Sequence, residues 1–78
     1  MDKLRRQIDV FDKESDSLIN EIYLDLFDLE LMKTRFNAPK DDYLMYNPYE
    51  IDSSKIDLFS EVKFDFKKYD YYLACYCD

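Results

Sequence analysis

The chain of 78 residues contains no glycine, so every turn that needs a positive φ must use another residue. Asparagine and aspartate tolerate that conformation best among the remaining residue types. We therefore expect Asn or Asp at such turns. The clearest turn signal lies at residues 37–42. Pro39 disfavours a helical conformation in the residue directly before it, Ala38, and Asn37 precedes both.

The length of the chain sets a limit on its hydrophobic core. A chain this short buries only about 60% of the surface that its unfolded form exposes. Apolar residues make up 47% of the sequence, and eight tyrosines with six phenylalanines supply large rings. Each ring buries much area at little cost in side-chain entropy. The sequence predicts a single domain over residues 1–78, built around one thin core.

Hydrophobic periodicity in the first half predicts one strand followed by helix. Residues 7–11 alternate with period two, which is typical of a strand. Apolar residues after Ser15 fall near helical spacing up to Phe36, without a proline. Because the pattern changes near Leu24, we expect two helices, over 15–22 and 27–36, with Asp25 as a cap. A single helix over 15–36 is the alternative.

The second half predicts a loop, a short helix and strand. Residues 43–49 indicate a loop with a short extended piece, closed by Asn47 and Pro48. Asp52 and the two serines after it are typical of a helix start. Residues 62–66 and 69–76 alternate as strands, with 67–68 as a turn between them or a bulge. The expected fold class is α+β: a small antiparallel sheet with two or three short helices packed on one face.

The sequence lacks the residues that most enzymes and cofactor sites use. Without histidine, the usual general base and the Ser-His and Cys-His nucleophile pairs cannot form. Without glycine, a phosphate-cradling loop is excluded. Cys75 and Cys77 are too few for a structural zinc site, and the strand geometry suits them as small apolar side chains. We expect no catalysis, no cofactor and no bound metal.

Two cysteines are also too few for a secreted disulfide scaffold. No apolar run reaches the length of a signal peptide or a membrane span. The sequence therefore predicts a reduced, cytoplasmic protein.

Negative charge is concentrated in two segments. Eleven basic against eighteen acidic residues give a net charge of −7, which disfavours direct contact with nucleic acid or an anionic membrane. Neither residues 14–32 nor residues 41–54 contain any Lys or Arg. Complementary charge favours a basic protein as the partner. A merely solvated surface is the alternative interpretation of both segments.

Tyrosines among carboxylates are typical of protein-recognition surfaces, because the rings give rigid contact area and the acids pair with basic side chains. The alternative is that these rings cover the core. On the first interpretation, the partner-binding residues are Asp25, Asp28, Glu30, Asp41, Asp42, Tyr43, Tyr46, Tyr49, Glu50 and Asp52.

Three stretches, together with Leu18, Ile19, Glu21 and Ile22 after the first of them, carry a resemblance to a known group of proteins. Residues 10–16, 36–42 and 64–73 (VFDKESD, FNAPKDD and FDFKKYDYYL) resemble small bacterial domains that look like immunity proteins of polymorphic toxin systems, including contact-dependent growth inhibition. This resemblance implies that the chain binds and neutralises a cognate toxin domain, often a basic nuclease. It assigns no interface residue, because such interfaces vary with the toxin.

Two other functions stay open from the sequence. The first is an acidic mimic of nucleic acid that inhibits a DNA-binding enzyme, which requires carboxylates at phosphate-like spacing along one face. The second is a structural homodimer without an inhibitory role, in which the strand at 69–76 pairs with its own copy.

Overall fold

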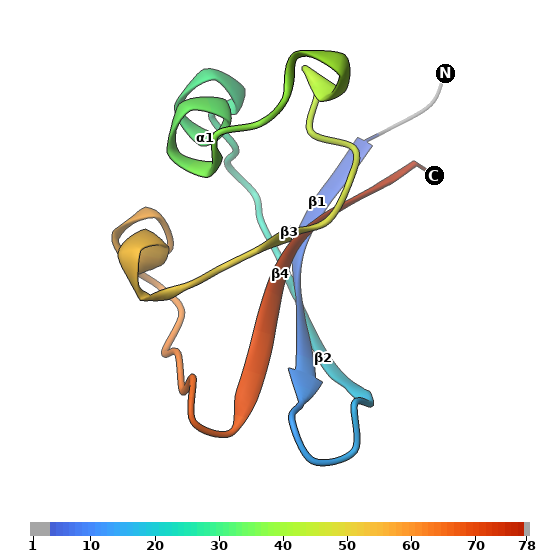
Figure 1. Ribbon diagram of the computed structural model, residues 1–78, viewed down its shortest axis with the longest axis vertical. Coiled ribbons are helices and arrows are strands. Elements are labelled where there is room, and N and C mark those ends of the chain that lie inside the picture. The colour runs from blue at the N-terminus through green and yellow to red at the C-terminus, as the bar shows by residue number, and fades with distance from the viewer. Residues whose placement is uncertain (1–3, 78) are drawn as a thin grey trace.

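The computed structural model describes residues 4–77, with Cys77 described by its backbone alone. The strands are β1 (Leu4–Asp12), β2 (Leu18–Tyr23), β3 (Tyr49–Glu50) and β4 (Tyr69–Cys77). They form one antiparallel sheet in the order β2-β1-β4-β3 (Figure 1). The helical elements are α1 (Leu29–Phe36) and two 3-10 helices, η1 (Lys40–Asp42) and η2 (Ser53–Leu58).

The first and last strands form the centre of the sheet. β1 and β4 pair without interruption from Leu4 opposite Cys77 to Asp12 opposite Tyr69. The strand predicted at 7–11 is confirmed and is longer than expected, and the strand predicted at 69–76 is confirmed. Since side chains alternate between the faces of a strand, this register decides which residues meet on each face.

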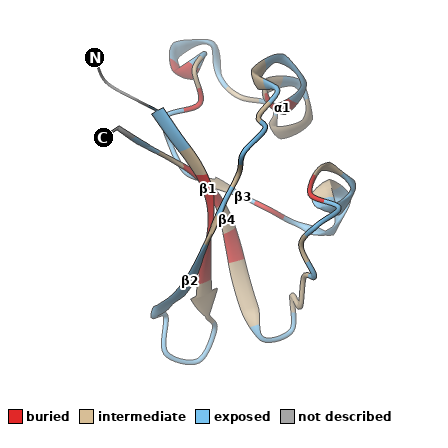
Figure 2. Ribbon diagram, turned by 180° about the vertical axis from the view of Figure 1, so that it is seen from behind, coloured by how far each residue is buried: buried red, intermediate tan, exposed pale blue. Residues whose placement is uncertain are grey.

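One face of the sheet carries the core. Ile8 and Val10 of β1 lie on the same face as Tyr71 and Leu73 of β4, and all four are buried. In Figure 1, α1 and η2 lie to one side of the strands, and Figure 2 shows buried residues along the centres of β1 and β4. The other buried core residues come from α1 and the connections that cover this face: Met32, Met45, Ile51 and Phe59.

The helix predicted at 15–22 is wrong, because residues 18–23 form strand β2. Ile22 of β2 lies opposite Ile8 of β1 and is partly buried, whereas Leu18 and Ile19 are exposed, so pairing with β1 and not local apolar spacing decides the structure of this segment. The polar stretch before it closes a hairpin. Asp12 Oδ1 accepts from the Glu14 amide at 2.8 Å, the same Asx chemistry that caps a helix.

The helix predicted at 27–36 is confirmed as α1, but its cap differs. Asp28, not Asp25, caps it by accepting from the Leu31 amide. The short helix predicted after Asp52 forms as the 3-10 helix η2. Asp52 caps it by accepting a hydrogen bond from the Ser54 amide. The loop predicted at 43–49, with its short extended piece, ends in the two-residue strand β3.

The strand predicted at 62–66 is wrong. Residues 62–65 form no strand and Phe66 already lies in the turn before β4. The rings of Phe64 and Phe66 stack with their centroids 5.3 Å apart. Both rings meet Tyr71 edge-on, at 4.7 and 5.3 Å, so they cover the end of the core. Lys67 and Lys68 lie in the turn directly before β4.

Three residues in the described part of the chain have positive φ: Asp16, Asn37 and Met45, near 55° in each case. The first two confirm the expectation that Asp and Asn replace glycine. Met45 does not fit it. Arg6 explains this exception, since its guanidinium donates to the carbonyl oxygens of Leu44 at 2.6 Å and Met45 at 2.7 Å. Those bonds and the burial of Met45 hold a conformation that its side chain disfavours.

The fold is therefore a four-stranded antiparallel sheet with helical segments on one face, within the predicted α+β class. Residues 4–77 contain one α-helix and two 3-10 helices, so two or three helices of the expected kind are not confirmed. None of the helices in this part of the chain has the length and apolar character needed to cross a membrane.

Candidate functional site

The second face of the sheet, here called the open face, carries none of the helices found in residues 4–77. Its side chains on the central strands include Gln7, Asp9 and Phe11 of β1, and Tyr72 and Tyr76 of β4. No element packs over them, yet Gln7 is fully buried and Asp9 is only 5% exposed. The rings and carboxylates of this face cover them instead. Buried polar side chains on a face that no helix covers are unusual, so this face is the candidate site.

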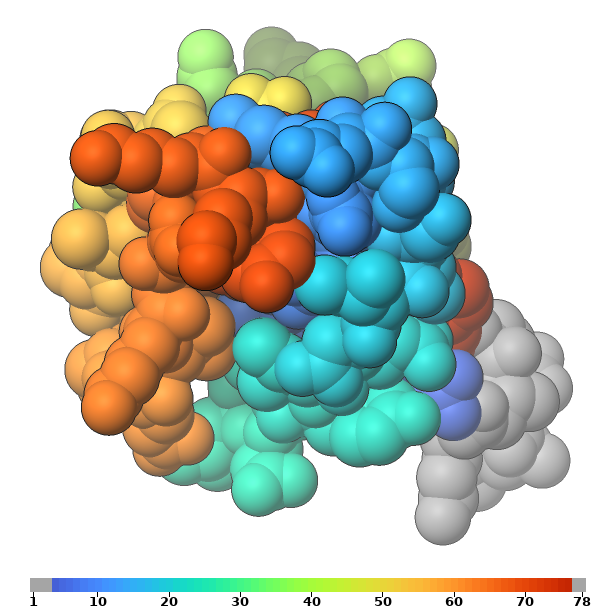
Figure 3. Space-filling view, turned by 90° about the horizontal axis from the view of Figure 1, so that it is seen from below, coloured from blue at the N-terminus to red at the C-terminus, as the bar shows by residue number. Residues whose placement is uncertain are grey.

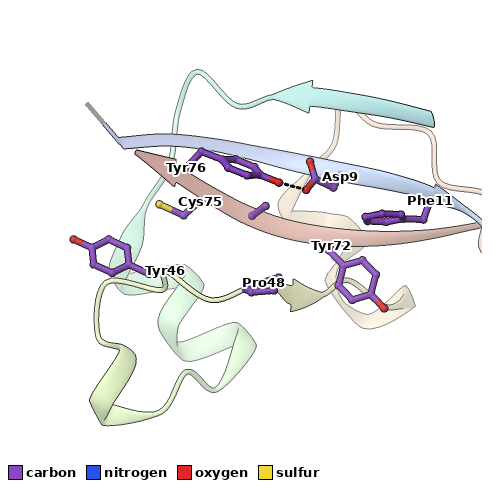
Figure 4. Close-up of a pocket in the computed structure, with 8 residues that line it drawn as sticks. Asp9, Phe11, Tyr46, Pro48, Tyr72, Cys75 and Tyr76 are labelled. Carbon is purple, nitrogen blue, oxygen red and sulfur yellow. Dashed lines mark hydrogen bonds between the residues drawn. The ribbon is translucent and has the colours of Figure 1, made fainter. Parts of the chain in front are cut away.

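A pocket of about 370 Å³ opens on this face, beside the free end of β4 (Figure 4). Because β3 is only two residues long, no strand of the described residues lies on the outer side of the last part of β4. The chain before β3 forms the opposite wall there. The pocket is lined by Asp9, Phe11, Tyr46, Pro48, Tyr72, Ala74, Cys75 and Tyr76.

Two internal polar contacts position the wall that carries Tyr46 and Pro48. The bonds of Arg6 to the Leu44 and Met45 carbonyls fasten this loop to β1. Asp42 fixes its shape from within, because its carboxylate accepts from the Tyr46 and Asn47 amides and from the Tyr49 hydroxyl. The loop is therefore held at both sides rather than free to close over the pocket.

A series of short hydrogen bonds connects β2, β1 and β4 across the open face. The Tyr76 hydroxyl donates to Asp9 Oδ2 at 2.6 Å, as Figure 4 shows. Gln7 Nε2 donates both to Asp9 Oδ1 and to Glu21 Oε2, each at 2.6 Å. The Gln7 amide thus joins two carboxylates from neighbouring strands.

This arrangement brings like charges together. Since one nitrogen contacts both, the bonded oxygens of Asp9 and Glu21 lie within about 5 Å of each other, where carboxylates repel. Neither residue forms an ion pair with any other residue in the described part of the chain. Arg5 lies nearby, with its guanidinium carbon 5.6 Å from the centre of the Tyr76 ring.

The electrostatics of the tyrosines follow from these contacts. The hydrogen bond to Asp9, together with burial, raises the pKa of Tyr76 to about 12. Burial and the neighbouring Glu50 carboxylate also raise the pKa of Tyr72. Both hydroxyls therefore stay protonated at neutral pH, and Tyr76 acts as a donor to Asp9. No group of acids and cysteines within residues 4–77 is arranged to hold a metal ion.

The structure distributes the ten residues predicted to bind a partner over several elements. Asp25, Asp28 and Glu30 are exposed around the start of α1, and Glu30 pairs with Lys33. Asp41 and Tyr43 are exposed on and directly after η1. Of the ten, only Tyr46 lines the pocket, while Glu50 lies on the strand beside Tyr72.

Besides Asp28, which caps α1, three more of the ten have internal roles that the sequence did not reveal. Asp42 is 8% exposed and organises its own loop, which gives it a structural role. Tyr49 is half-buried, donates to Asp42 and packs its ring against Phe36. Asp52 caps η2 and contacts Lys55. For these positions the alternative interpretation, a structural role, is the better one.

A second hollow of about 410 Å³ lies on the other side of the molecule, between the chain after β2 and the chain after η2. Figure 3 shows the gap there, between the segment near residue 60 and the segment near residues 25–30. Leu26 at its border is 90% exposed, and Asp25 and Glu61 supply its acids. It has no buried carboxylate comparable to Asp9.

Sequence reasoning missed Asp9, Tyr72 and Tyr76, which the sheet brings together from distant parts of the chain. One signal was present, because Tyr72 and Tyr76 fall on the non-core face of the predicted strand at 69–76. Asp9 gave no signal of its own. Its neighbours become known only when β1 is paired with β4.

Comparison with known proteins gives a family but no characterised relative. No curated protein and no solved structure matches the chain. A family model described as a domain of unknown function, DUF7683, matches residues 5–74, which include most of the sheet but end before Tyr76. The chain belongs to this family.

Proposed function

We propose that the chain is a non-catalytic binding protein that docks onto a basic protein partner through the open face of its sheet. The resemblance of its sequence to immunity proteins makes a toxin domain, such as a basic nuclease, the proposed partner. The proposed setting is the bacterial cytoplasm, where such a toxin would be neutralised. This function needs no cofactor and no reactive side chain.

One observation carries the proposal: a pocket walled by aromatic rings has an acidic side chain, Asp9, in its lining. Tyrosine rings bury large area on binding, and a carboxylate among them favours basic over acidic partners. The overall charge of −7 acts in the same direction, because it speeds encounter with a positively charged protein.

The structure gives less support to the two alternatives. A mimic of nucleic acid needs a row of free carboxylates, whereas Asp42 and Asp52 are used in internal hydrogen bonds. In a homodimer through residues 69–76, β4 would pair with its copy. However, β1 occupies one edge of β4 and β3 occupies part of the other, so only the last residues remain open.

The proposal is tested by co-expression with a candidate toxin domain, taken from the neighbouring upstream gene where that gene encodes one. We expect the chain to restore growth of cells that produce the toxin, and the two purified proteins to elute together from a sizing column. Cells that still die, together with separate elution at low salt, would exclude a neutralising role. A matched control is an unrelated acidic protein of similar size and charge, which is expected to give neither result.

A further inference from the structure

We propose that the pocket beside Asp9 receives the guanidinium group of one arginine of the partner. This inference rests on the proposed function, since it names the chemical group that the open face recognises. It follows from three separate features of the described residues: uncompensated charge, an acceptor without a donor, and the shape of the walls.

The first feature is charge without a counter-ion. Asp9 is 5% exposed, so water screens its charge poorly. The Gln7 side-chain amide that donates to Asp9 also donates to Glu21, whose carboxylate adds a second negative charge nearby. Buried carboxylates normally have a cation close to them. Here no ion pair within residues 4–77 involves either, so a cation supplied from outside would relieve both.

The second feature is a missing hydrogen-bond donor. Gln7 is fully buried, and its side-chain oxygen Oε1 has no hydrogen-bond partner. Rotating the amide does not remove the problem, because Nε2 is already required to donate to Asp9 and Glu21. An unpaired buried acceptor is uncommon in folded proteins. Gln7 is not itself a lining residue, but it lies directly opposite Ala74, which lines the pocket, so the unpaired oxygen lies close to the pocket rather than in its wall.

The third feature favours arginine over lysine. The walls contain the flat rings of Tyr46, Tyr72 and Tyr76, on which a planar guanidinium can stack. Its five N–H groups can serve several acceptors at once, whereas an ammonium group is a more strongly hydrated point charge. Arg5 already lies 5.4 Å from the centre of the Tyr23 ring on the same face, which is the same type of contact.

The volume of the pocket agrees with this occupant. At about 370 Å³ it lies near the lower end of the range for small-ligand sites, which suits a single side chain rather than a large cofactor. Its opening past the end of β4 leaves room for the partner backbone outside.

The test is an NMR titration of the isotope-labelled chain, at constant ionic strength, with the blocked amino acid N-acetyl-arginine N-methylamide. We expect saturable shifts at the backbone amides of Gln7, Asp9, Ala74 and Tyr76. The lysine analogue should bind about tenfold more weakly, and the citrulline analogue, which lacks the charge, should give no saturable shift.

Variants locate the site. Asp9→Asn keeps the shape of the side chain and should abolish the saturable shifts. Tyr46→Ala removes a ring that is 51% exposed, so the fold should survive while binding weakens severalfold. Tyr43→Ala, which removes a ring that is 61% exposed and outside the pocket, is the matched control and should bind as the wild type does.

Three results would overturn the inference: no saturable shift below about 50 mM arginine analogue, equal binding of the lysine analogue, or unchanged binding by Asp9→Asn. These results are separate from the growth test. Restored growth without arginine binding leaves the docking function and removes this site. Arginine binding without restored growth keeps the arginine site and removes the neutralising function.

Discussion

The hydroxyl of Tyr76 donates a 2.6 Å hydrogen bond to the carboxylate of Asp9, although 67 positions separate the two residues in the sequence. Tyr76 lies opposite Arg5 in the pairing of β1 with β4, so its ring extends along the sheet to reach Asp9. The bond therefore forms only when both strands are paired in the correct register. The pocket is a product of the sheet and not of any single segment.

Removal of this hydroxyl should weaken the fold moderately. Tyr76→Phe keeps the ring but leaves Asp9 with one donor fewer, and a hydrogen bond to a charged acceptor is worth about 1–2 kcal/mol at a partly exposed position. The free energy of unfolding, measured by urea titration, should fall by that amount. Tyr43→Phe, whose ring is exposed, is the control and should leave it unchanged. Equal stability of both variants would show that the bond contributes nothing.

The tyrosines make stability depend on alkaline pH. The pKa is raised to about 12 for Tyr76, chiefly by its bond to Asp9, and to about 12 for Tyr49, chiefly by burial. The unfolded chain loses these protons near pH 10. The stabilisation is therefore complete below pH 10 and lost as the pH rises from about 10 to 12.

Ultraviolet absorbance of tyrosinate measures this effect directly. The wild type should show a late phase of ionisation near pH 12, and Tyr49→Phe and Tyr76→Phe should each reduce it by about one tyrosine out of eight. Thermal midpoints should fall over the same pH range. Ionisation of all tyrosines near pH 10 in the folded chain would contradict the assigned hydrogen bonds.

Asp42 should behave as a structural residue. Its pKa is lowered, first by the bond from the Tyr49 hydroxyl, so its contribution is complete above the ordinary pKa of aspartate and is lost as the pH falls from there through the lowered pKa of the folded chain. Asp42→Ala should cost more stability than Tyr76→Phe, because three donors lose their acceptor. Asp41→Ala, on the exposed neighbour, should stay within about 0.5 kcal/mol of the wild type. Denaturant titration at pH 7 and pH 3 compares the two.

Leu26 provides a test of the second hollow. Its side chain is 90% exposed, so Leu26→Ser should change the free energy of unfolding by less than about 0.5 kcal/mol. Phe59→Ala in the core below should cost about 3–5 kcal/mol. If Leu26→Ser instead weakens binding of the toxin domain as strongly as Asp9→Asn does, the docking surface would have to include this hollow.

The sequence correctly predicted those elements whose local pattern fits only one type of secondary structure. The strands at 7–11 and 69–76 follow from period-two alternation, and α1 follows from an uninterrupted amphipathic stretch. The pattern of residues 12–17 fits two structures. An Asp side chain that accepts a hydrogen bond from the backbone amide two residues later can begin a helix or close a hairpin. Only the pairing of Ile22 with Ile8 decides for the hairpin.

The site was less predictable than the fold. Carboxylates close together in sequence proved to be caps and loop anchors, as at Asp28, Asp42 and Asp52. The pocket depends instead on contacts between residues far apart in sequence, such as Arg6 with Met45 and Asp9 with Tyr76. Local composition carries no information on such pairs, because they depend on register.

The most direct test of the open face is the affinity of the purified chain for the toxin domain, measured by calorimetry at low salt. We predict that Asp9→Asn and Tyr46→Ala each weaken binding at least about tenfold, and that Asp41→Asn changes it less than about twofold. Both pocket variants must first show an unchanged fold by NMR. Wild-type affinity in both would contradict docking through this face of the sheet.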